Sequence, residues 1–348
     1  MRILLVTNDW PPDVGGIQTY LSGLVARTTH EVRVLAPTHP DAAPSEGEVR
    51  HPGFMWPSRR VRALIEAEAT AFAADVVWFG APTPPALLGP DLGRPYVVMC
   101  HGAEVSTAAA IPFVRGKLRS SLAGAAEVLA VSQYTADLVA RFSGREVARL
   151  GVGVTASGAE RPGVRRPGMT VVSVGRLVRR KGLDRLIDAL GGVHGWHGRL
   201  VLAGAGPDRQ RLERRAARRG VALEVRSGLD DAAVRGVLRD ADVFAQPTRT
   251  RLFGLDWEGL GIVFLEAAAE GLPVIAGRSG GAPEAVRPGV TGFVAGSKRE
   301  LVAAISALSD TDRAAAMGAA GREMVASEWA WGPVIERFDG AMARAAQA

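Results

Sequence analysis

The sequence predicts an α/β protein built from two doubly wound, Rossmann-like domains in tandem. Its 348 residues suggest two domains, at roughly 150 residues for each. Short apolar runs alternate with helical patterns along both halves, which is typical of parallel βαβ units with right-handed crossovers. A stretch rich in glycine and proline, residues 151–168, interrupts that alternation and predicts a linker. Because ligands bind beyond the carboxyl ends of the strands in such sheets, two facing domains predict a central cleft.

The first half carries apolar runs of four to six residues that do not alternate with polar ones. Such runs are typical of strands covered on both faces. Helical patterns separate them, the clearest at Ile17–Arg27, Arg59–Ala74 and Gln133–Phe142. The predicted strands are Ile3–Thr7, Val32–Ala36, Val76–Gly80, Tyr96–Cys100 and Val128–Val131.

The alternation of apolar runs and helical patterns resumes after the linker. The clearest helical patterns there are Arg209–Arg219 and Asp231–Asp240. The predicted strands here are Thr170–Gly175, Leu200–Gly204, Leu223–Ser227, Val243–Gln246, Val274–Gly277 and Gly292–Ala295. We expect an N-terminal domain over residues 1–155 and a C-terminal domain over 156–329. Whether the last helix, about residues 330–348, packs back on the first domain is left open by the pattern.

Composition excludes several classes of protein. The net charge is +6, from 42 basic and 36 acidic residues. Because this charge is small for 348 residues and is dispersed, we expect no nucleic-acid partner. The single cysteine, Cys100, excludes a disulfide framework, and the six histidines show no metal-ligand spacing. No run approaches the ~18 apolar residues that cross a membrane, and the N-terminal apolar run is too short for a signal peptide. We therefore expect a cytoplasmic protein that is soluble or at most peripheral on the inner face of the membrane.

The first candidate site is the loop between the first strand and the first helix. Gly15 and Gly16 let backbone N–H groups approach a ligand, and the start of the following helix favours anions. The alternative is a tight turn that needs a positive φ.

A second candidate follows the first strand of the C-terminal domain. Arg176 comes just past the strand and Lys181 just before a new helix, where two cations can hold a diphosphate without a metal. A solvated basic loop is the alternative.

The third candidate is the segment Asp256–Ala269. Glu258 and Glu266 are eight residues apart, and a helix beginning near Gly261 places Glu258 before it and Glu266 inside it. Free N–H groups at that helix start can meet hydroxyl groups or phosphate, and the Glu266 carboxylate can accept both hydrogens of a ribose diol. The alternative for Glu266 is a surface helix residue.

Two further patterns are rejected as sites. Asp240 and Asp242 have the spacing of a metal-binding DxD motif, but they end a helix and begin a strand. Cys100 precedes His101, yet adjacent residues of a strand point to opposite faces, so Cys100 is expected to pack in the core.

Together these segments resemble the retaining glycosyltransferases of the GT-B fold, and the similarity covers nearly the whole chain. Within that group the sequence is most similar to actinobacterial GDP-mannose-dependent phosphatidylinositol mannosyltransferases. The residues that carry the likeness are Gly15-Gly16, Arg176 with Lys181, Glu258 with Glu266, Ser279–Glu284, Asn8–Pro12, Val77–Gly80 and Thr248–Arg251.

The resemblance implies transfer of a hexose, mannose from GDP-mannose by the closest likeness, to a lipid-linked inositol or mannoside. It implies GDP-mannose as co-substrate, with no cofactor and no metal. The implied catalytic residues are His101, Glu258, Arg176 and Lys181. The implied donor-binding residues are Gly15, Gly16, Arg176, Arg180, Lys181, Ser227, Gly228, Leu229, Glu258, Gly259, Leu260, Gly261, Ile262 and Glu266. The implied acceptor-binding residues are Asp9, Gln18, Arg59, Arg60 and Arg62.

The resemblance also implies which part of the donor or acceptor each of these residues contacts. Arg176 and Lys181 would neutralise the leaving diphosphate, and Glu266 would hold the ribose. Glu258 and the backbone after it would hold the hexose, the Ser227–Leu229 loop would line the base, and His101 would face sugar and acceptor. Attack on the front face would explain retention without a carboxylate nucleophile.

The sequence leaves two questions open. Trp56–Arg62 and Phe113–Arg119 mix apolar and basic residues, which suits either an anionic lipid surface or ordinary arginine-rich helices. The alternatives for function are a GT-B transferase that uses another nucleotide sugar on a soluble acceptor, and a non-catalytic nucleotide-sugar-binding protein. The oligomeric state is not predicted.

Overall fold

The structure is a computed structural model that describes residues 1–13, 15–42, 47–155 and 168–348. Of the predicted linker, residues 156–167 lie outside the described part of the chain. Contacts divide the described chain into two units. The first unit combines Met1–Gly153 with Trp331–Ala348, and the second unit is Val154–Ala330.

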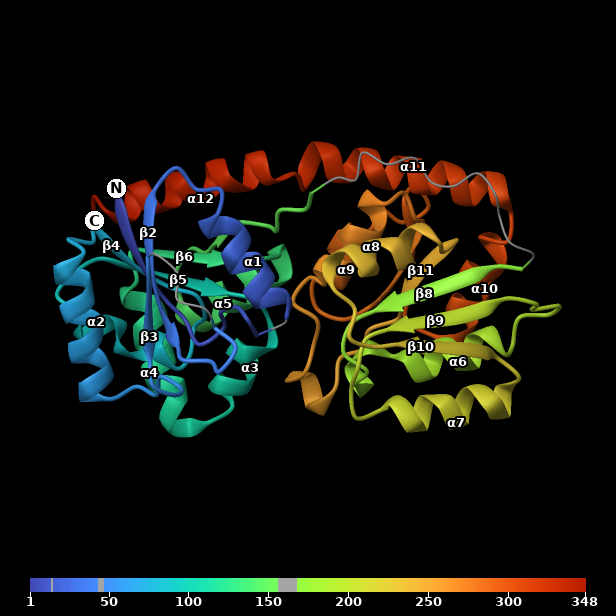
Figure 1. Cartoon of the computed structure of the whole chain (residues 1–348), viewed down its shortest axis with the longest axis horizontal. Coiled ribbons are helices and arrows are strands. Elements are labelled where there is room, and N and C mark those ends of the chain that lie inside the picture. The colour runs from blue at the N-terminus through green and yellow to red at the C-terminus, as the bar shows by residue number, and fades with distance from the viewer. Residues whose placement is uncertain (14, 43–46, 156–167) are drawn as a thin grey trace. The chain divides into compact units, whose positions relative to one another are not determined.

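The first unit contains a parallel sheet with the strand order β3-β2-β1-β4-β5-β6-β7 (Figure 1). The order reverses between β1 and β4, so the topological switch point lies between their carboxyl ends. The strands are β1 (Arg2–Val6), β2 (Glu31–Pro37), β3 (Glu48–His51), β4 (Val76–Phe79), β5 (Tyr96–Cys100), β6 (Glu127–Ala130) and β7 (Ala148–Arg149).

The helices of the first unit begin where the sequence supplies a suitable first turn. Ser58 and Ser132 cap α2 and α5 by accepting hydrogen bonds from the backbone N–H groups of Val61 and Thr135. The helices are α1 (Gly16–Val25), α2 (Arg59–Ala71), the short η1 (Pro85–Asp91), α3 (Ala103–Ala109), α4 (Pro112–Gly124), α5 (Gln133–Ser143) and α12 (Trp331–Ala345).

Helix α12 comes from the end of the chain and packs on β5 and β6 of the first sheet. Its buried residues include Val334 and Phe338, and the Phe338 ring lies 4.8 Å from that of Trp78 on β4. Both rings are fully buried, so the helix covers apolar surface that the first sheet would otherwise expose.

The second unit contains a parallel sheet with the strand order β10-β9-β8-β11-β12-β13. Its switch point lies between β8 and β11. The strands are β8 (Thr170–Val174), β9 (Arg199–Ala203), β10 (Ala222–Arg226), β11 (Val243–Gln246), β12 (Val274–Gly277) and β13 (Gly292–Ala295). The helices are η2 (Arg179–Lys181), α6 (Leu183–Leu190), α7 (Arg209–Arg219), α8 (Asp231–Arg239), η3 (Leu252–Gly254), α9 (Ile262–Ala269), η4 (Ala282–Ala285), α10 (Lys298–Ala307) and α11 (Thr311–Glu328).

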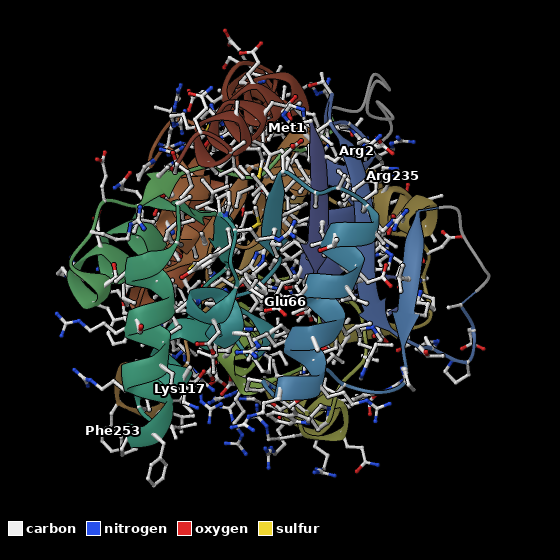
Figure 2. The ribbon with its side chains drawn as sticks, turned by 90° about the vertical axis from the view of Figure 1, so that its left-hand side faces the viewer. Met1, Arg2, Glu66, Lys117, Arg235 and Phe253 are labelled. Atoms are coloured by element: carbon white, nitrogen blue, oxygen red, sulfur yellow. The ribbon has the colours of Figure 1, made fainter. Side chains whose placement is uncertain are left out.

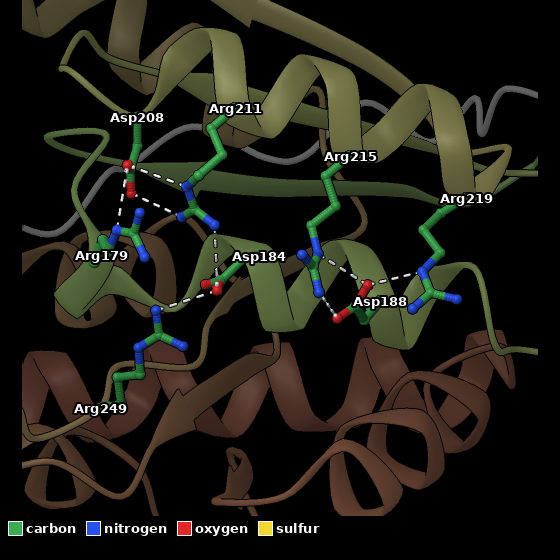
Figure 3. A network of polar contacts seen from close by, with 8 residues as sticks. All are labelled: Arg179, Asp184, Asp188, Asp208, Arg211, Arg215, Arg219 and Arg249. Atoms are coloured by element: carbon green, nitrogen blue, oxygen red, sulfur yellow. Dashed lines mark hydrogen bonds and ion pairs between the residues drawn. The ribbon is translucent and has the colours of Figure 1, made fainter.

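Many arginines of the second unit are paired with carboxylates between α6 and α7 (Figure 3). Arg211 bonds to Asp208 at 2.8 Å and contacts Asp184 at 3.5 Å, and Asp184 also accepts a bond from Arg249 at 3.1 Å. Hydrogen bonds from Arg211 lower the pKa of Asp208, against the opposing effect of burial. Because Asp184 lies in the first turn of α6, which starts directly after Gly182, this network also fixes the loop that follows β8.

The structure confirms the predicted fold class, and several strands match residue for residue, among them Tyr96–Cys100, Val243–Gln246 and Gly292–Ala295. The sequence analysis missed β3 and β7. Both lie at the edges of the first sheet and are only partly buried, so they lack the continuous apolar run of the central strands.

We predict that Phe338→Ala lowers the free energy of unfolding by about 3–5 kcal/mol, because it leaves a cavity against Trp78. Phe113→Ala on α4 is the control, since that ring is 88% exposed and its loss should change stability by less than about 0.5 kcal/mol. Urea denaturation followed by tryptophan fluorescence measures both. Equal stability of the two variants would mean that α12 is not docked on the sheet.

Candidate active site

A cluster of three charged side chains lies at the switch point of the second sheet. Glu258 is buried, and one of its carboxylate oxygens accepts hydrogen bonds from Lys181 Nζ at 2.9 Å and from Arg180 Nη1 at 2.6 Å. The Arg180 guanidinium also pairs with Asp256 at 3.0 Å. Burial would raise the pKa of Glu258, but Lys181 and Arg180 outweigh it and hold that pKa below its usual value. The cluster is therefore an ionised carboxylate between two cations.

The position of Lys181 depends on the glycine that follows it. Gly182 adopts φ +70°, and a Cβ there would lie 1.9 Å from the carbonyl oxygen of Pro247, just past β11. Only glycine fits this conformation and this close approach. The turn consequently places Lys181 against the carboxyl ends of both β8 and β11.

The backbone at Glu258 is held by the segment that follows β12. The Glu258 N–H donates to Ser279 Oγ at 3.3 Å, and its carbonyl accepts from the Gly281 N–H at 3.0 Å. Ser279 Oγ also lies 3.1 Å from Thr250 Oγ1. The sequence analysis gave Ser279 no role of its own, although the phrase Ser279–Glu284 was part of the family resemblance.

Helix α9 begins at Ile262, directly after Gly261, which agrees with the predicted start near Gly261. Gly261 has φ +82° and offers no side-chain cap, although its carbonyl accepts a hydrogen bond from the Phe264 N–H at 3.0 Å. The helix is apolar apart from Glu266, which is partly buried in its second turn. The pKa of Glu266 is raised to about 7 by burial first and by the charge of nearby Asp231 second, against the smaller opposing effect of Arg235.

The remaining donor-side residues lie on neighbouring loops at the same edge of the sheet. Arg176 is exposed just past β8, and no charged partner for it is found in the described part of the chain. Ser227, Gly228 and Leu229 follow β10, and Ser227 Oγ donates to the carbonyl of Gly204 at 3.0 Å. Because β10, β9 and β8 are adjacent in the sheet, their loops line one edge.

A second group of polar side chains lies at the switch point of the first sheet. Asp9 follows β1, and its Oδ1 accepts a bond from Gln18 Nε2 on α1 at 3.2 Å. Burial raises the pKa of Asp9, and the charges of Glu104 and Asp13 raise it further, while His101 lowers it. Gly15, before α1, packs against Gln18, where a Cβ would lie 2.5 Å from Oε1.

His101 follows β5 and has a fixed ring. Its Nε2 lies 2.6 Å from the carbonyl oxygen of Gly80. A carbonyl oxygen only accepts, so Nε2–H donates, and in the neutral form of the ring Nδ1 is an acceptor. Glu104 Oε1 accepts from the backbone N–H groups of His101 and Gly102 at 2.6 and 2.8 Å, which fixes this turn.

The arginines predicted on the acceptor side begin α2. Arg59 and Arg60 are exposed, and Arg62 pairs with Glu66 at 3.6 Å. The structure records no contact of these arginines with Asp9 or Gln18 among the residues it describes. Asn8, which the sequence analysis did not assign, holds the segment before α2 at the end of β1, because its amide bonds to both Met55 N and Met55 O at 2.9 and 3.3 Å.

In the described residues, no group of three or more His, Cys, Asp or Glu side chains could hold a metal ion. Asp242 instead accepts a hydrogen bond from the Thr170 N–H at 2.8 Å and so fixes β8. Cys100 is fully buried, and burial raises the pKa of its thiol. Among the helices described, none has the length and apolarity to span a bilayer.

Two family models match the chain in succession. Glycosyltransferase Family 4 matches residues 14–154, and Glycosyl transferases group 1 matches residues 160–324. The chain is 39% identical to the GDP-mannose-dependent alpha-(1-6)-phosphatidylinositol monomannoside mannosyltransferase of Mycobacterium tuberculosis over 95% of both proteins. It is 41% identical to the protein of the same name from Mycolicibacterium smegmatis, over 94% of this chain and 95% of that protein. This chain belongs to that family of glycosyltransferases.

Solved structures agree on the fold of this glycosyltransferase. Sucrose-phosphate synthase from Thermosynechococcus elongatus superposes with a TM-score of 0.82 at 21% identity, covering 99% of this chain and 98% of that one. Anabaena Alr3699/HepE in complex with UDP and glucose superposes with a TM-score of 0.80 at 18% identity, over 99% of both chains. The predicted family, the GT-B fold and the hexosyltransferase class are confirmed. The roles of individual residues in this glycosyltransferase stay predictions.

We predict that Glu266 makes the stability of the glycosyltransferase depend on pH. Its folded pKa of about 7 exceeds the ordinary 4.5, so the group contributes stability below pH 4.5 that is lost as the pH rises to 7. The stability of Glu266→Gln relative to the wild type should therefore be higher at pH 8 than at pH 5, by about 1–2 kcal/mol after solvent screening.

Urea denaturation at the two pH values measures this difference. Glu258→Gln is the control in the same unit, and it should destabilise at pH 8 because it leaves the buried Lys181 without its counter-charge. A pH-independent difference between Glu266→Gln and the wild type would contradict the assignment.

Proposed function

We propose that this glycosyltransferase moves mannose from GDP-mannose to a phosphatidylinositol monomannoside. The observation that carries the proposal is the 39–41% identity to relatives named for that reaction, over at least 94% of the chain. The cations at the switch point of the second sheet support it, because that edge is where α/β sheets bind nucleotides.

The donor diphosphate meets Arg176 and Lys181 in this proposal. Lys181 uses one of its three N–H donors on Glu258, which leaves two for phosphate oxygens. Arg176 is exposed, and since no described residue accepts its donors they are available for a diphosphate. These two cations stabilise the negative charge that grows on the leaving group, the task that a metal ion performs in other transferases.

The rest of the nucleotide sugar fits the neighbouring elements. The Glu266 carboxylate accepts from the ribose diol, and the Ser227–Leu229 loop lines the base. Glu258 and the backbone of Gly259–Ile262 hold the hexose, since N–H groups at the start of a helix suit hydroxyl oxygens. Because Glu258 is already ionised between two cations, it acts as an acceptor of hydrogen bonds from the sugar.

The acceptor meets the polar group at the switch point of the first sheet. Asp9 and Gln18 offer hydrogen-bonding groups for sugar hydroxyls, and His101 offers Nδ1 as an acceptor. Arg59 and Arg60 on α2 are exposed cations that suit the phosphate of the lipid.

The chemical step proposed is attack on the front face of the donor. The acceptor oxygen bonds to the anomeric carbon as the anomeric C–O bond to the diphosphate breaks, and the acceptor proton passes to the departing phosphate oxygen. The sugar keeps its configuration, and neither a covalent intermediate nor a metal is used.

We predict that Arg176→Ala lowers kcat by about 100- to 1,000-fold, the usual loss when one stabiliser of a growing charge is removed. Arg179→Ala is the matched control, because Arg179 is exposed in the same loop and contacts Asp208 at 3.9 Å. Release of GDP, followed with EDTA present, measures kcat for both. Turnover of Arg176→Ala within threefold of the wild type would rule out its role at the diphosphate.

We also propose that the first unit associates with an anionic membrane. Trp56 before α2 is 66% exposed and Phe113 on α4 is 88% exposed, beside the cations Arg59, Arg60 and Lys117. Figure 2 shows Lys117 on α4 and Glu66 on α2 on the same side of this unit. Exposed aromatic rings among cations suit the headgroup layer of anionic lipids.

The triple variant Arg59→Gln, Arg60→Gln, Lys117→Gln should sediment with phosphatidylinositol vesicles at least about tenfold less than the wild type, since each cation near the surface contributes about 1 kcal/mol. The control is Arg209→Gln, Arg214→Gln, Arg218→Gln, which removes three charges from exposed positions on α7. Equal sedimentation of the two triple variants would refute a specific membrane face.

A further inference from the structure

Tyr20 on α1 joins three parts of the first unit. The side chain is buried, with 2% of its surface exposed, and its hydroxyl donates to the carbonyl of Gly151 at 2.7 Å. Its ring lies 6.1 Å from the His101 ring at an interplanar angle of 88°, and 6.2 Å from the Trp331 ring at 21°. One side chain therefore contacts both a residue of the candidate site and the two segments that leave and re-enter this unit.

Those two segments pack closely against each other and against α1. The chain leaves the unit after Gly153 and returns at Trp331. The Trp331 ring packs on Gly153, where a Cβ would lie 2.2 Å from it, and on Gly23 of α1, where a Cβ would lie 2.4 Å from it. The Arg27 guanidinium lies 4.5 Å from the centre of the same ring. Glycine at both positions lets the indole lie against the backbone.

The ring of His101 has two restraints. The hydrogen bond from Nε2 to Gly80 O at 2.6 Å sets the tautomer and fixes one point of the ring. This hydrogen bond alone would still allow the imidazole ring to rotate about the axis from Nε2 to the Gly80 oxygen. The hydrogen bond from the Tyr20 hydroxyl to Gly151 O holds the Tyr20 ring perpendicular to the imidazole. The ring held in this way opposes the rotation and so sets the direction of Nδ1.

We propose that Tyr20 is a positioning residue that orients the His101 imidazole toward the acceptor. It also couples this orientation to the two crossing segments, which are the chain around Gly151 that leaves the first unit and the chain at Trp331 that returns to it. A shift at Gly151 or Trp331 reaches Tyr20 by direct contact and passes from Tyr20 to His101. This inference rests on the role of His101 in the proposed function.

A purely structural tyrosine in the same unit provides a matched control. Tyr96 on β5 is buried, and its hydroxyl donates to the buried Ser121 carbonyl at 2.8 Å. Its ring packs on Phe79 at 5.9 Å. The structure records no contact of Tyr96 with His101 or the crossing segments among the residues described, so Tyr96→Phe removes the same kind of hydrogen bond away from the site.

The experiment compares Tyr20→Phe with Tyr96→Phe. Both leave a buried carbonyl without its donor, and we expect both to lower Tm by a few degrees. Only Tyr20→Phe should lower kcat with the lipid acceptor, by about tenfold, and shift the ¹⁵N signals of the His101 ring. The Kd for GDP, measured by calorimetry, should stay within twofold of the wild type in both. Equal kcat values and unchanged His101 signals in the two variants would overturn the proposal.

His101→Ala separates this inference from the proposed function. Wild-type turnover by His101→Ala would refute the role of His101 and, with it, that of Tyr20. If His101→Ala is slow, the double variant with Tyr20→Phe should be no slower, because Tyr20 acts through His101. Multiplied losses in the double variant would mean that Tyr20 acts elsewhere and would overturn the positioning role alone.

A second variant covers the case in which Tyr20→Phe folds poorly. Trp331→Leu keeps Tyr20 but removes the ring stacked on it, and we expect a similar fall in kcat, whereas Trp331→Phe keeps a ring and should stay nearer the wild type. Equal kcat values for Trp331→Leu and Trp331→Phe would oppose the coupling.

Discussion

The candidate donor site depends on one buried ion cluster, in which the Glu258 carboxylate lies between Lys181 and Arg180. A buried charge is costly unless it is paired, so these side chains constrain one another. The cluster ties the loop after β8 to the loop before α9, although the residues are 77 and 78 positions apart. The first N–H groups of α9 are consequently held at a fixed place relative to the cations, which is the arrangement that a nucleotide sugar would require.

The two switch points present different chemistry. In the second unit, cations surround one ionised carboxylate, and Arg176 adds a further exposed positive charge. In the first unit, Asp9, Gln18 and His101 offer hydrogen-bonding groups, and burial raises the pKa of Asp9. The first arrangement favours a multiply charged anion, and the second favours hydroxyl groups. A donor that carries a diphosphate and an acceptor that carries sugar hydroxyls match this division.

The sequence predicted the central strands well, because a strand buried on both faces is a continuous apolar run whose ends are marked by polar residues. Val243–Gln246 and Tyr96–Cys100 are examples. Edge strands such as Glu48–His51 lack that signal. Glu258 and Lys181 were both singled out, but their ion pair was not, since contacts between distant loops depend on how the strands are ordered in the sheet. For the same reason, the sequence did not predict the hydrogen bonds between Asn8 and Met55 or the hydrogen bond from the Glu258 N–H to Ser279.

The packing of α12 has a consequence for how the protein is made. Phe338 is fully buried against Trp78, yet the whole second unit lies between these two residues in the chain. A ribosome synthesises the first sheet early but delivers the helix that covers it only after Val154–Ala330 has emerged. The first unit is therefore begun first and completed last, and until then the apolar surface that α12 covers lacks its partner.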